Sequence, residues 1–237
     1  MAEVTKFRFG NTYPDDLYVG NSLVDRVYYG SELVYGFAPP IQIELVEVIS
    51  FPNNSVAVVP NYVDDTHFGV LLELAAGSIV TPSPPSGWTL FAQQTIPSFK
   101  LYGSYKILTI SDRGTSVSFK DGSAADYDQL YIFKTITNSM IKNISEGDFS
   151  AGRGTNITIT APILNPDQSA VSFHYFYSSS TFPTTTSNPA SDQTIYHTYL
   201  DYGGSQYKIV NGPSIPTNTE YGVTNGLSQL AFWIIIE

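Results

Sequence analysis

The sequence contains no cysteine and few basic residues. Without Cys, the 237-residue chain can form neither disulfides nor thiolate metal sites. The 11 Lys and Arg residues are outnumbered by 21 Asp and Glu residues, giving a net charge of −10. A nucleic-acid backbone is bound through a basic stripe, so this charge balance argues against nucleic acid as a partner.

Long apolar runs are also missing. No segment approaches the 18 apolar residues of a membrane-spanning helix, and residues 1–10 read MAEVTKFRFG, without the apolar stretch of a secretion signal. We therefore expect neither membrane insertion nor a standard signal peptide. A chain of this length can bury roughly 70–75% of its unfolded surface, which is enough for a core without disulfide support.

What the chain does contain is typical of β structure. Tyr (17) and Phe (14) are abundant, and 18 Gly and 15 Pro interrupt the sequence every few residues. Residues 64–77 are the one helix candidate, but residues 67–74 also fit a buried strand, which we favour. The strands expected after residue 40 are 41–51, 67–74, 89–93, 101–109, 116–119, 129–136, 156–160, 170–177, 194–202, 206–210, 220–223 and 230–236.

A ten-residue repeat occupies the N-terminal segment. Leu17-Tyr18-Val19-Gly20-Asn21-Ser22-Leu23-Val24 aligns with Val27-Tyr28-Tyr29-Gly30-Ser31-Glu32-Leu33-Val34. Gly at the first turn position suits a two-residue type II′ turn, so each copy predicts a hairpin. Together the copies predict a three-stranded meander over 17–19, 22–29 and 32–35, with residues 7–10 as a candidate fourth strand. So small a meander is marginal alone and needs a surface to pack against.

The pair Pro39-Pro40 predicts a stiff connector, because each proline fixes its own φ and restricts the residue before it. We expect an N-terminal β-hairpin anchor over 1–37, a connector over 38–40 and a sandwich over 41–237. The strand spacing after the connector is typical of an all-β sandwich, and about a dozen strands fit one jelly roll better than two separate sandwiches. The predicted fold class is therefore all-β: a small β-meander followed by a large jelly-roll-like β-sandwich.

The C-terminal strand, residues 230–236, is apolar on both faces. A central strand buried between two layers is the simpler interpretation. A strand buried partly by a second subunit is the alternative.

A search for catalytic patterns gives none. The sequence has no Gly-x-Ser-x-Gly elbow, no phosphate-binding glycine loop and no closely spaced pair of histidines; His67, His174 and His197 lie far apart. The acidic pairs Asp64-Asp65 and Asp126-x-Asp128 could offer oxygens to Ca²⁺, but such pairs are usually solvated turns. We predict a protein that is not an enzyme and has no cofactor and no metal.

Aromatic residues carry the binding prediction. Exposed Tyr rings stack on sugars or form protein contacts with little loss of side-chain entropy. We predict ligand contacts at Tyr196, Tyr199, Tyr202 and Tyr207. The alternative is that most tyrosines fill the core, where we also place Trp88 and Trp233.

Two features resemble a known class of protein. The tandem Tyr-x-Gly-x-x-Leu-Val hairpins resemble the short leader of many tailed-phage virion proteins. Pro84-Pro85-Ser86-Gly87-Trp88-Thr89-Leu90 is similar to a loop-to-strand step in a β-sandwich module of phage and prophage structural proteins. In that module a Tyr-x-Lys strand and a Ser-Phe strand follow, matched here by Tyr105-Lys106-Ile107 and Ser118-Phe119. The resemblance covers residues 15–36 and 66–136.

The resemblance implies a virion structural protein on the phage particle surface, with no catalytic residues to carry over. We expect a tail fibre, tail-tip or adhesin component that binds a host-surface glycan or protein. Its partners would be other virion structural proteins and further copies of itself. The residues expected to anchor it are Leu17, Tyr18, Gly20, Leu23, Tyr28, Gly30, Leu33 and Val34. A capsid decoration protein on the head and a free carbohydrate-binding module remain the alternatives.

Overall fold

The computed structural model divides the chain into two compact units, residues 1–39 and 40–237. The division falls at the Pro39-Pro40 pair, within the segment expected to be a connector. The residues that the structure describes are 18–19, 22–23, 27–29, 32–35, 41–52, 55–76, 83–96, 99–118, 127–136, 140–165, 167–179, 183–196, 202–211 and 216–237.

The N-terminal unit contains two short antiparallel hairpins. β1 (Tyr18–Val19) pairs with β2 (Ser22–Leu23), and β3 (Val27–Tyr29) pairs with β4 (Glu32–Tyr35). Val19 lies opposite Ser22 and Tyr29 opposite Glu32, the pairing expected beside a two-residue turn, while the turn residues themselves lie outside the described residues.

The predicted three-stranded meander is wrong in one respect. β2 and β3 belong to separate two-stranded sheets, and the β3–β4 register shifts between Val27 and Tyr28. Of the expected anchor residues, Tyr18, Leu23, Tyr28, Leu33 and Val34 lie in these strands. Leu17, Gly20, Gly30 and the candidate strand at residues 7–10 lie outside the described residues.

The second unit contains two runs of strands in succession. The first run is β5 (Ile43–Pro52), β6 (Ala57–Val58), β7 (His67–Ala76), β8 (Thr89–Ile96), β9 (Phe99–Ile107), a 3-10 helix η1 (Ile110–Asp112), β10 (Ser116–Val117) and β11 (Tyr127–Thr135). The second run is β12 (Ile144–Gly152), β13 (Asn156–Ile159), β14 (Ser169–Ser178), β15 (Thr185–Asn188), β16 (Gln193–Tyr196), β17 (Gly203–Val210), β18 (Thr219–Val223) and β19 (Gly226–Ile236).

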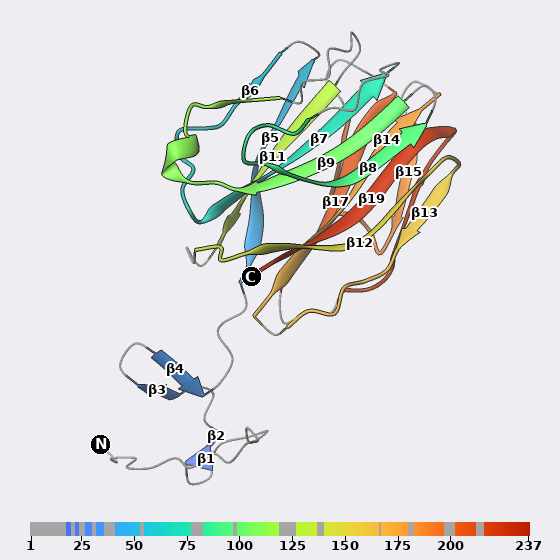
Figure 1. The fold of residues 1–237 in the computed structure, drawn as a ribbon. Helices are drawn as coiled ribbons and strands as arrows, with labels where there is room; N and C mark the ends of the chain where they lie inside the picture. The colour runs from blue at the N-terminus through green and yellow to red at the C-terminus, as the bar shows by residue number, and fades with distance from the viewer. Residues whose placement is uncertain are drawn as a thin grey trace. The chain divides into compact units, whose positions relative to one another are not determined.

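These two runs form two structural repeats. The first main sheet has the order β5-β11-β7-β9-β8, and the second main sheet has the order β12-β19-β14-β17-β16 (Figure 1). Both orders place the first strand of the run at one edge and its last strand next to it. Each repeat also has a minor sheet, β10-β6 in the first and β13-β18-β15 in the second.

Strand register confirms the equivalence of the repeats. Val70 lies opposite Tyr105 in the first main sheet, and Phe173 lies opposite Tyr207 in the second. This register superposes the identical tripeptides Tyr105-Lys106-Ile107 and Tyr207-Lys208-Ile209. The first strand of each repeat, β5 and β12, also breaks its register with the last strand at the equivalent place.

The all-β sandwich prediction is therefore confirmed, with a finer strand order than expected. Within each repeat the chain passes between the main and the minor sheet, as in a jelly roll. The sequence predicted one large jelly-roll-like sandwich, whereas the structure holds two jelly-roll-like repeats within one compact unit.

Three cores hold the layers together. The central core lies between the main sheets and is rich in aromatic pairs, including Phe68 with Phe133 at 4.9 Å and Phe173 with Phe232 at 5.2 Å between ring centroids. Such pairs add about 0.5–1.5 kcal/mol each beyond their buried area. An outer core lies between each main sheet and its minor sheet, with Trp88 in the first and Trp233 in the second. Both tryptophans are therefore core residues, as predicted.

The expected strands correspond closely to the observed ones. Residues 67–74 form the strand β7 rather than a helix, and the C-terminal strand β19 is central, between β12 and β14, with both faces buried by this chain. Three strands were not expected: β6, β12 and β15. β12 has the sequence ISEGDFSAG, whose acidic and glycine residues hide its strand character.

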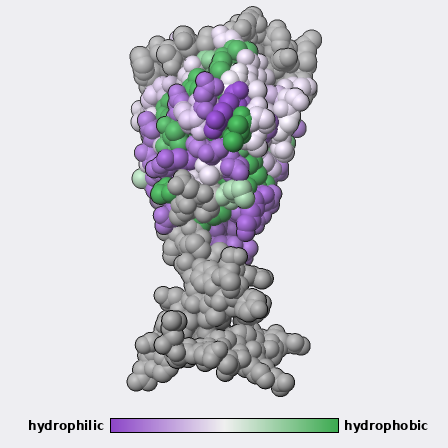
Figure 2. Space-filling view, turned by 90° about the vertical axis from the view of Figure 1, so that its left-hand side faces the viewer, coloured by the Kyte–Doolittle hydropathy of each residue, from purple (hydrophilic) through white to green (hydrophobic). Residues whose placement is uncertain are grey.

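The outer face of the first repeat is mixed in character. Figure 2 shows hydrophobic atoms in separate patches among hydrophilic ones on this side of the molecule. Exposed apolar residues there include Val56 just before β6, Val58 in β6, and Ile110 in η1. Among the described residues, no helix has the length and apolar character needed to span a membrane.

Candidate functional site

The tyrosines predicted to contact a ligand divide into two groups. Tyr196 and Tyr202 are each 37% exposed, whereas Tyr207 is only 6% exposed. Tyr199 lies outside the described residues. Two of the four predicted residues are therefore available at the surface.

Tyr207 is a core residue, which corrects the prediction for this position. Its ring lies 5.9 Å from Tyr131 and 6.2 Å from Phe133, and burial raises the pKa of its phenol. The inward face of β17 carries this ring because strand residues alternate between faces and Tyr207 pairs with the buried Phe173.

Tyr196 and Tyr202 lie at the same end of the second main sheet. Tyr196 pairs with Gly204, and Tyr202 immediately precedes Gly203, which pairs with Tyr177. A β-carbon on Gly204 would lie 2.5 Å from the Ile195 carbonyl oxygen, so glycine allows the two strands to approach here. We call Tyr177, Tyr196 and Tyr202 together the tyrosine end; Tyr196 lies on the face of the sheet that carries Phe176, and Tyr177 packs on the central core on the opposite face.

The rings of the tyrosine end are held in place. The Tyr196 hydroxyl donates to the Pro183 carbonyl at 2.8 Å, and its ring packs edge-on against Phe176 at 6.2 Å. The Tyr202 ring meets Tyr177 edge-on at 6.4 Å. Rings fixed before a ligand arrives lose little entropy on binding.

The surroundings of the tyrosine end are polar and uncharged. The described segments 176–179, 183–188, 193–196, 202–207 and 221–229 contain no Asp, Glu, Lys or Arg. Hydroxyl and amide groups dominate: Ser178 Oγ donates to the Thr224 carbonyl at 2.5 Å, and the Ser179 amide donates to the Asn225 carbonyl at 3.1 Å. Aromatic rings among such groups match the chemistry of an uncharged sugar or a polar protein surface.

Of the acidic residues considered for Ca²⁺, the described ones, Asp64, Asp65 and Asp128, are not grouped as metal ligands. Asp64 Oδ1 accepts hydrogen bonds from the Thr66 amide and hydroxyl and lies 2.9 Å from His67 Nδ1. These bonds from Thr66 lower the pKa of Asp64 to about 2. Asp65 is exposed, Asp128 is buried and Asp126 lies outside the described residues. Within the described ranges, no three His, Asp or Glu side chains are grouped as metal ligands.

His174 is fully buried in a polar network beneath the second minor sheet. Its Nδ1 accepts from Gln206 Nε2 at 3.1 Å, and its Nε2 donates to Gln229 Oε1 at 2.9 Å. Burial lowers the pKa of His174 to about 3, so the ring is neutral at ordinary pH. Its ring also stacks on Tyr221 at 5.0 Å. His67 is buried in the turn described above, and His197 lies outside the described residues.

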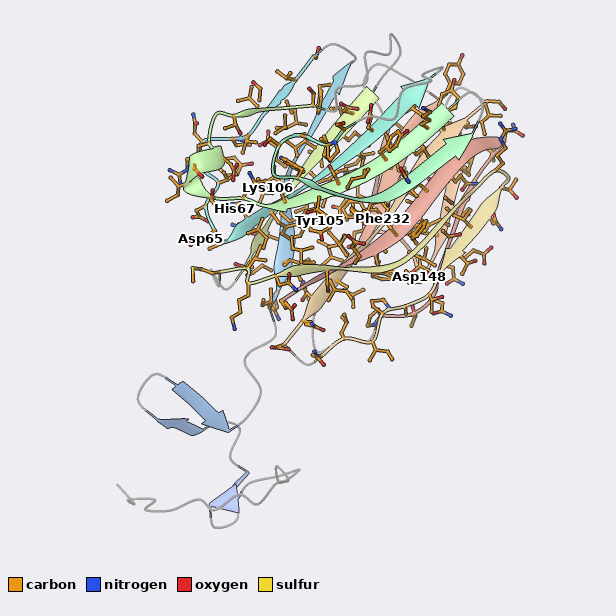
Figure 3. All side chains as sticks on the ribbon, viewed as in Figure 1. Asp65, His67, Tyr105, Lys106, Asp148 and Phe232 are labelled. Carbon is orange, nitrogen blue, oxygen red and sulfur yellow. The ribbon has the colours of Figure 1, made fainter. Side chains whose placement is uncertain are left out.

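One surface was not predicted from the sequence because β12 was not expected to be a strand. Its residues Glu146 and Phe149 are exposed, and Phe149 pairs with the buried Phe232 of β19. Figure 3 labels Phe232 and Tyr105, which both contact Phe91 of β8. An acidic and an aromatic side chain on an edge strand are the signal that could have pointed to this surface.

Comparison with known proteins gives no relatives. No protein-family model, no curated protein and no solved structure matches this chain.

Proposed function

We propose that this chain is a non-enzymatic structural protein of a tailed-phage virion, at the tail as a fibre, tail-tip or adhesin component. Residues 1–37 anchor it to other virion proteins, and the sandwich of residues 41–237 is displayed for binding to the host surface. The division of the chain into a small N-terminal unit and a large unit with its own core carries this proposal.

The small unit suits an anchor. Its described strands are two to four residues long and lie in two-stranded sheets, which are marginal in water without a packing surface. Neighbouring virion proteins would supply that surface. The repeated hairpins and their resemblance to phage leaders support the same role.

The large unit suits display and binding. Its three cores are each built from described residues of the large unit, and the tyrosine end offers fixed rings among uncharged polar groups. Each sandwich would bind a host-surface glycan or protein weakly. Several copies in one particle would strengthen attachment, because binding of one copy raises the effective concentration of the others.

Deletion of residues 1–37 tests the anchor. Particles assembled with the truncated chain should lack it, while the separated sandwich stays folded by circular dichroism. Incorporation of the truncated chain at full occupancy would overturn the proposal.

A double variant tests host binding. Particles that carry the chain with Tyr196→Ala and Tyr202→Ala should contain it in normal amounts but adsorb poorly to cells. The matched control is Gln93→Ala, at the position of the first repeat that corresponds to Tyr196.

A free carbohydrate-binding module is the second candidate, favoured by the two exposed tyrosines. It predicts saturable binding of oligosaccharide by the isolated chain and no association with particles. The deletion experiment distinguishes the two, because a free module would be missing from particles with or without residues 1–37.

A further inference from the structure

The two repeats make the two edges of the sandwich comparable. β8 of the first main sheet lies against β12 of the second at one edge, and the remaining edge strands are β5 and β16. By register, Glu146 of β12 corresponds to Leu45 of β5, and Phe149 corresponds to Val48. A difference between these residues therefore distinguishes the β8–β12 edge from the equivalent edge of β5 and β16.

At the edge strands β5 and β16, apolar side chains cover the central core. Leu45, Val48 and Ile195 are partly buried and pack on the central core. Tyr207 of the neighbouring strand is buried and directs its hydroxyl to Gln193 Oε1 at 3.4 Å. Aliphatic side chains therefore cover the core along these strands.

The β8–β12 edge is open and chemically different. Glu146 occupies the place of the partly buried Leu45, and Phe149 is 53% exposed although it lies opposite the buried Phe232. The next ring inward is Phe91, which lies 4.5 Å from Phe232 and 5.2 Å from Tyr105 between ring centroids. Aromatic rings of the central core thus continue to the surface at this edge.

Polar groups stand beside these rings. The Tyr105 hydroxyl donates to the Ile144 carbonyl of β12 at 3.3 Å and also bonds to the Thr89 side chain. Burial, together with the negative charge of Glu146, raises the pKa of the Tyr105 phenol. Among the described residues, Glu146 has no ion-pair partner.

The backbone at this edge disfavours an added peptide strand. β8 has an extra residue at Phe91, and β12 has an irregular register between Glu146 and Phe149. Bulges on both strands interrupt the regular spacing of free amides and carbonyls that a pairing strand needs. A ring-shaped ligand that uses side chains is favoured over an extended peptide.

We propose that the β8–β12 edge is a saccharide-binding site, built by Phe149 and Phe91 as stacking surfaces and by Glu146 as an acceptor for a pair of sugar hydroxyls. Sugar rings stack their apolar C–H faces on aromatic side chains, and a carboxylate accepts from adjacent hydroxyls. The Thr89 hydroxyl supplies a further polar contact. This site is separate from the tyrosine end and does not depend on where the chain resides in a virion.

A fluorescence reporter tests the site in the full chain. Both native tryptophans are buried, so Phe149→Trp adds the one exposed indole among the described residues. The probes are tetra- to hexasaccharides of glucose, galactose, mannose and N-acetylglucosamine, at millimolar concentration. Binding should shift the emission of Phe149→Trp to shorter wavelength in a saturable way, because a stacked sugar removes water from the indole. The wild-type chain should bind the same probe by calorimetry.

Two variants locate the binding. Glu146→Gln in the reporter chain should weaken affinity by about 10- to 100-fold, the range for losing a hydrogen bond to a charged group. The control Val48→Ala, at the corresponding place on β5, should leave affinity unchanged. The proposal is overturned if none of the probes binds the wild-type chain with a Kd below about 10 mM. It is also overturned if binding survives Glu146→Gln and Phe149→Ala but is lost in Tyr196→Ala, which would assign the sugar to the tyrosine end.

Discussion

At the scale of single residues, glycines mark where backbones come close. A β-carbon on Gly147 of β12 would lie 2.6 Å from the Trp233 β-carbon, and Trp233 is fully buried. Neither atom can swing away, so the edge strand itself must shift. A glycine is required here by packing rather than by a turn.

We predict that Gly147→Ala destabilises the sandwich by about 1–3 kcal/mol, the range for overpacking a tight site. Gly152→Ala on the same strand is the control, because its added carbon would meet only Ile157 Cγ2 at 3.9 Å. Urea denaturation of both variants measures the difference. Equal stability of the two would refute the close approach of β12 to Trp233.

His174 gives the protein a specific dependence on pH. Its pKa is about 3 in the folded chain against 6.5 for an unperturbed histidine, so between these values the unfolded chain holds one more proton than the folded chain. The contribution of the neutral ring to the free energy of unfolding is fully present above pH 6.5 and is lost as the pH falls. The loss is about 1.4 kcal/mol for each pH unit.

We expect the free energy of unfolding in urea to fall between pH 6.5 and pH 5 in the wild-type chain and to change much less in His174→Gln. This window lies above the range in which Asp64 loses its contribution, since the pKa of Asp64 falls from 3.8 to about 2 on folding. An equal pH slope in the variant would show that another group is responsible.

At the scale of elements, the start of β5 is fastened to the second repeat. Asn211, just after β17, accepts from the Ile43 amide at 2.7 Å and donates to the Ile43 carbonyl at 3.1 Å. The Ile41 amide donates to the Asp167 carbonyl at 3.0 Å, and Ser169 donates to the Ile41 carbonyl. The N-terminal end of β5 and the residues just before it are therefore held by the other repeat.

Asn211→Ala should cost about 1–3 kcal/mol, because it leaves both backbone groups of Ile43 without their partner. The Ile43 amide should also exchange with solvent faster, as measured by NMR hydrogen exchange. Asn218→Ala is the control, since it removes one exposed bond from the Ala161 amide. Unchanged exchange at Ile43 would contradict the fastening of β5.

Edge strands also show how far sequence reasoning can reach. The period-2 apolar pattern of β14 identified that strand, as did the two-sided apolar sequence of β19. β12 could not be found this way, because an edge strand with a bulge exposes polar residues out of phase. The saccharide site proposed on β12 could therefore not be predicted from the sequence, whereas Tyr196 and Tyr202 were predicted from the abundance of tyrosine.

At the scale of the whole molecule, the two repeats share the central core. Residues from both main sheets pack there, and a buried polar chain crosses it: Ser205 donates to Gln129 Oε1 at 2.6 Å and is bonded to the Tyr131 hydroxyl. Neither repeat can lose this contact without exposing the apolar face of the other. The sandwich should therefore behave as one folding unit.

We predict a single calorimetric transition for the sandwich, with equal calorimetric and van't Hoff enthalpies. Ser205→Ala should lower the temperature of the whole transition, because it removes the hydroxyl that joins the two sheets. Two separate transitions, with only the second repeat affected by Ser205→Ala, would show that the repeats fold independently.

The repeat itself was not predicted from the sequence. Few residues are identical between the runs, apart from Tyr105-Lys106-Ile107 with Tyr207-Lys208-Ile209 and isolated pairs such as Pro85 with Pro189. Equivalent residues lie on the same face of their sheets but differ in residue type. Tyr131 and Phe232, for example, both lie in the central core. The N-terminal hairpins were easier to recognise because glycine is required at a fixed place in each turn.

The central claim is that the chain is anchored in a virion tail and displays its sandwich outward. Antibody-gold labelling of intact particles, viewed by negative-stain electron microscopy, tests it most directly. Antibodies against the sandwich should place gold at the tail end of each particle. Gold spread over the head would identify a capsid decoration protein and contradict the tail position. Particles without gold would contradict display on the virion surface.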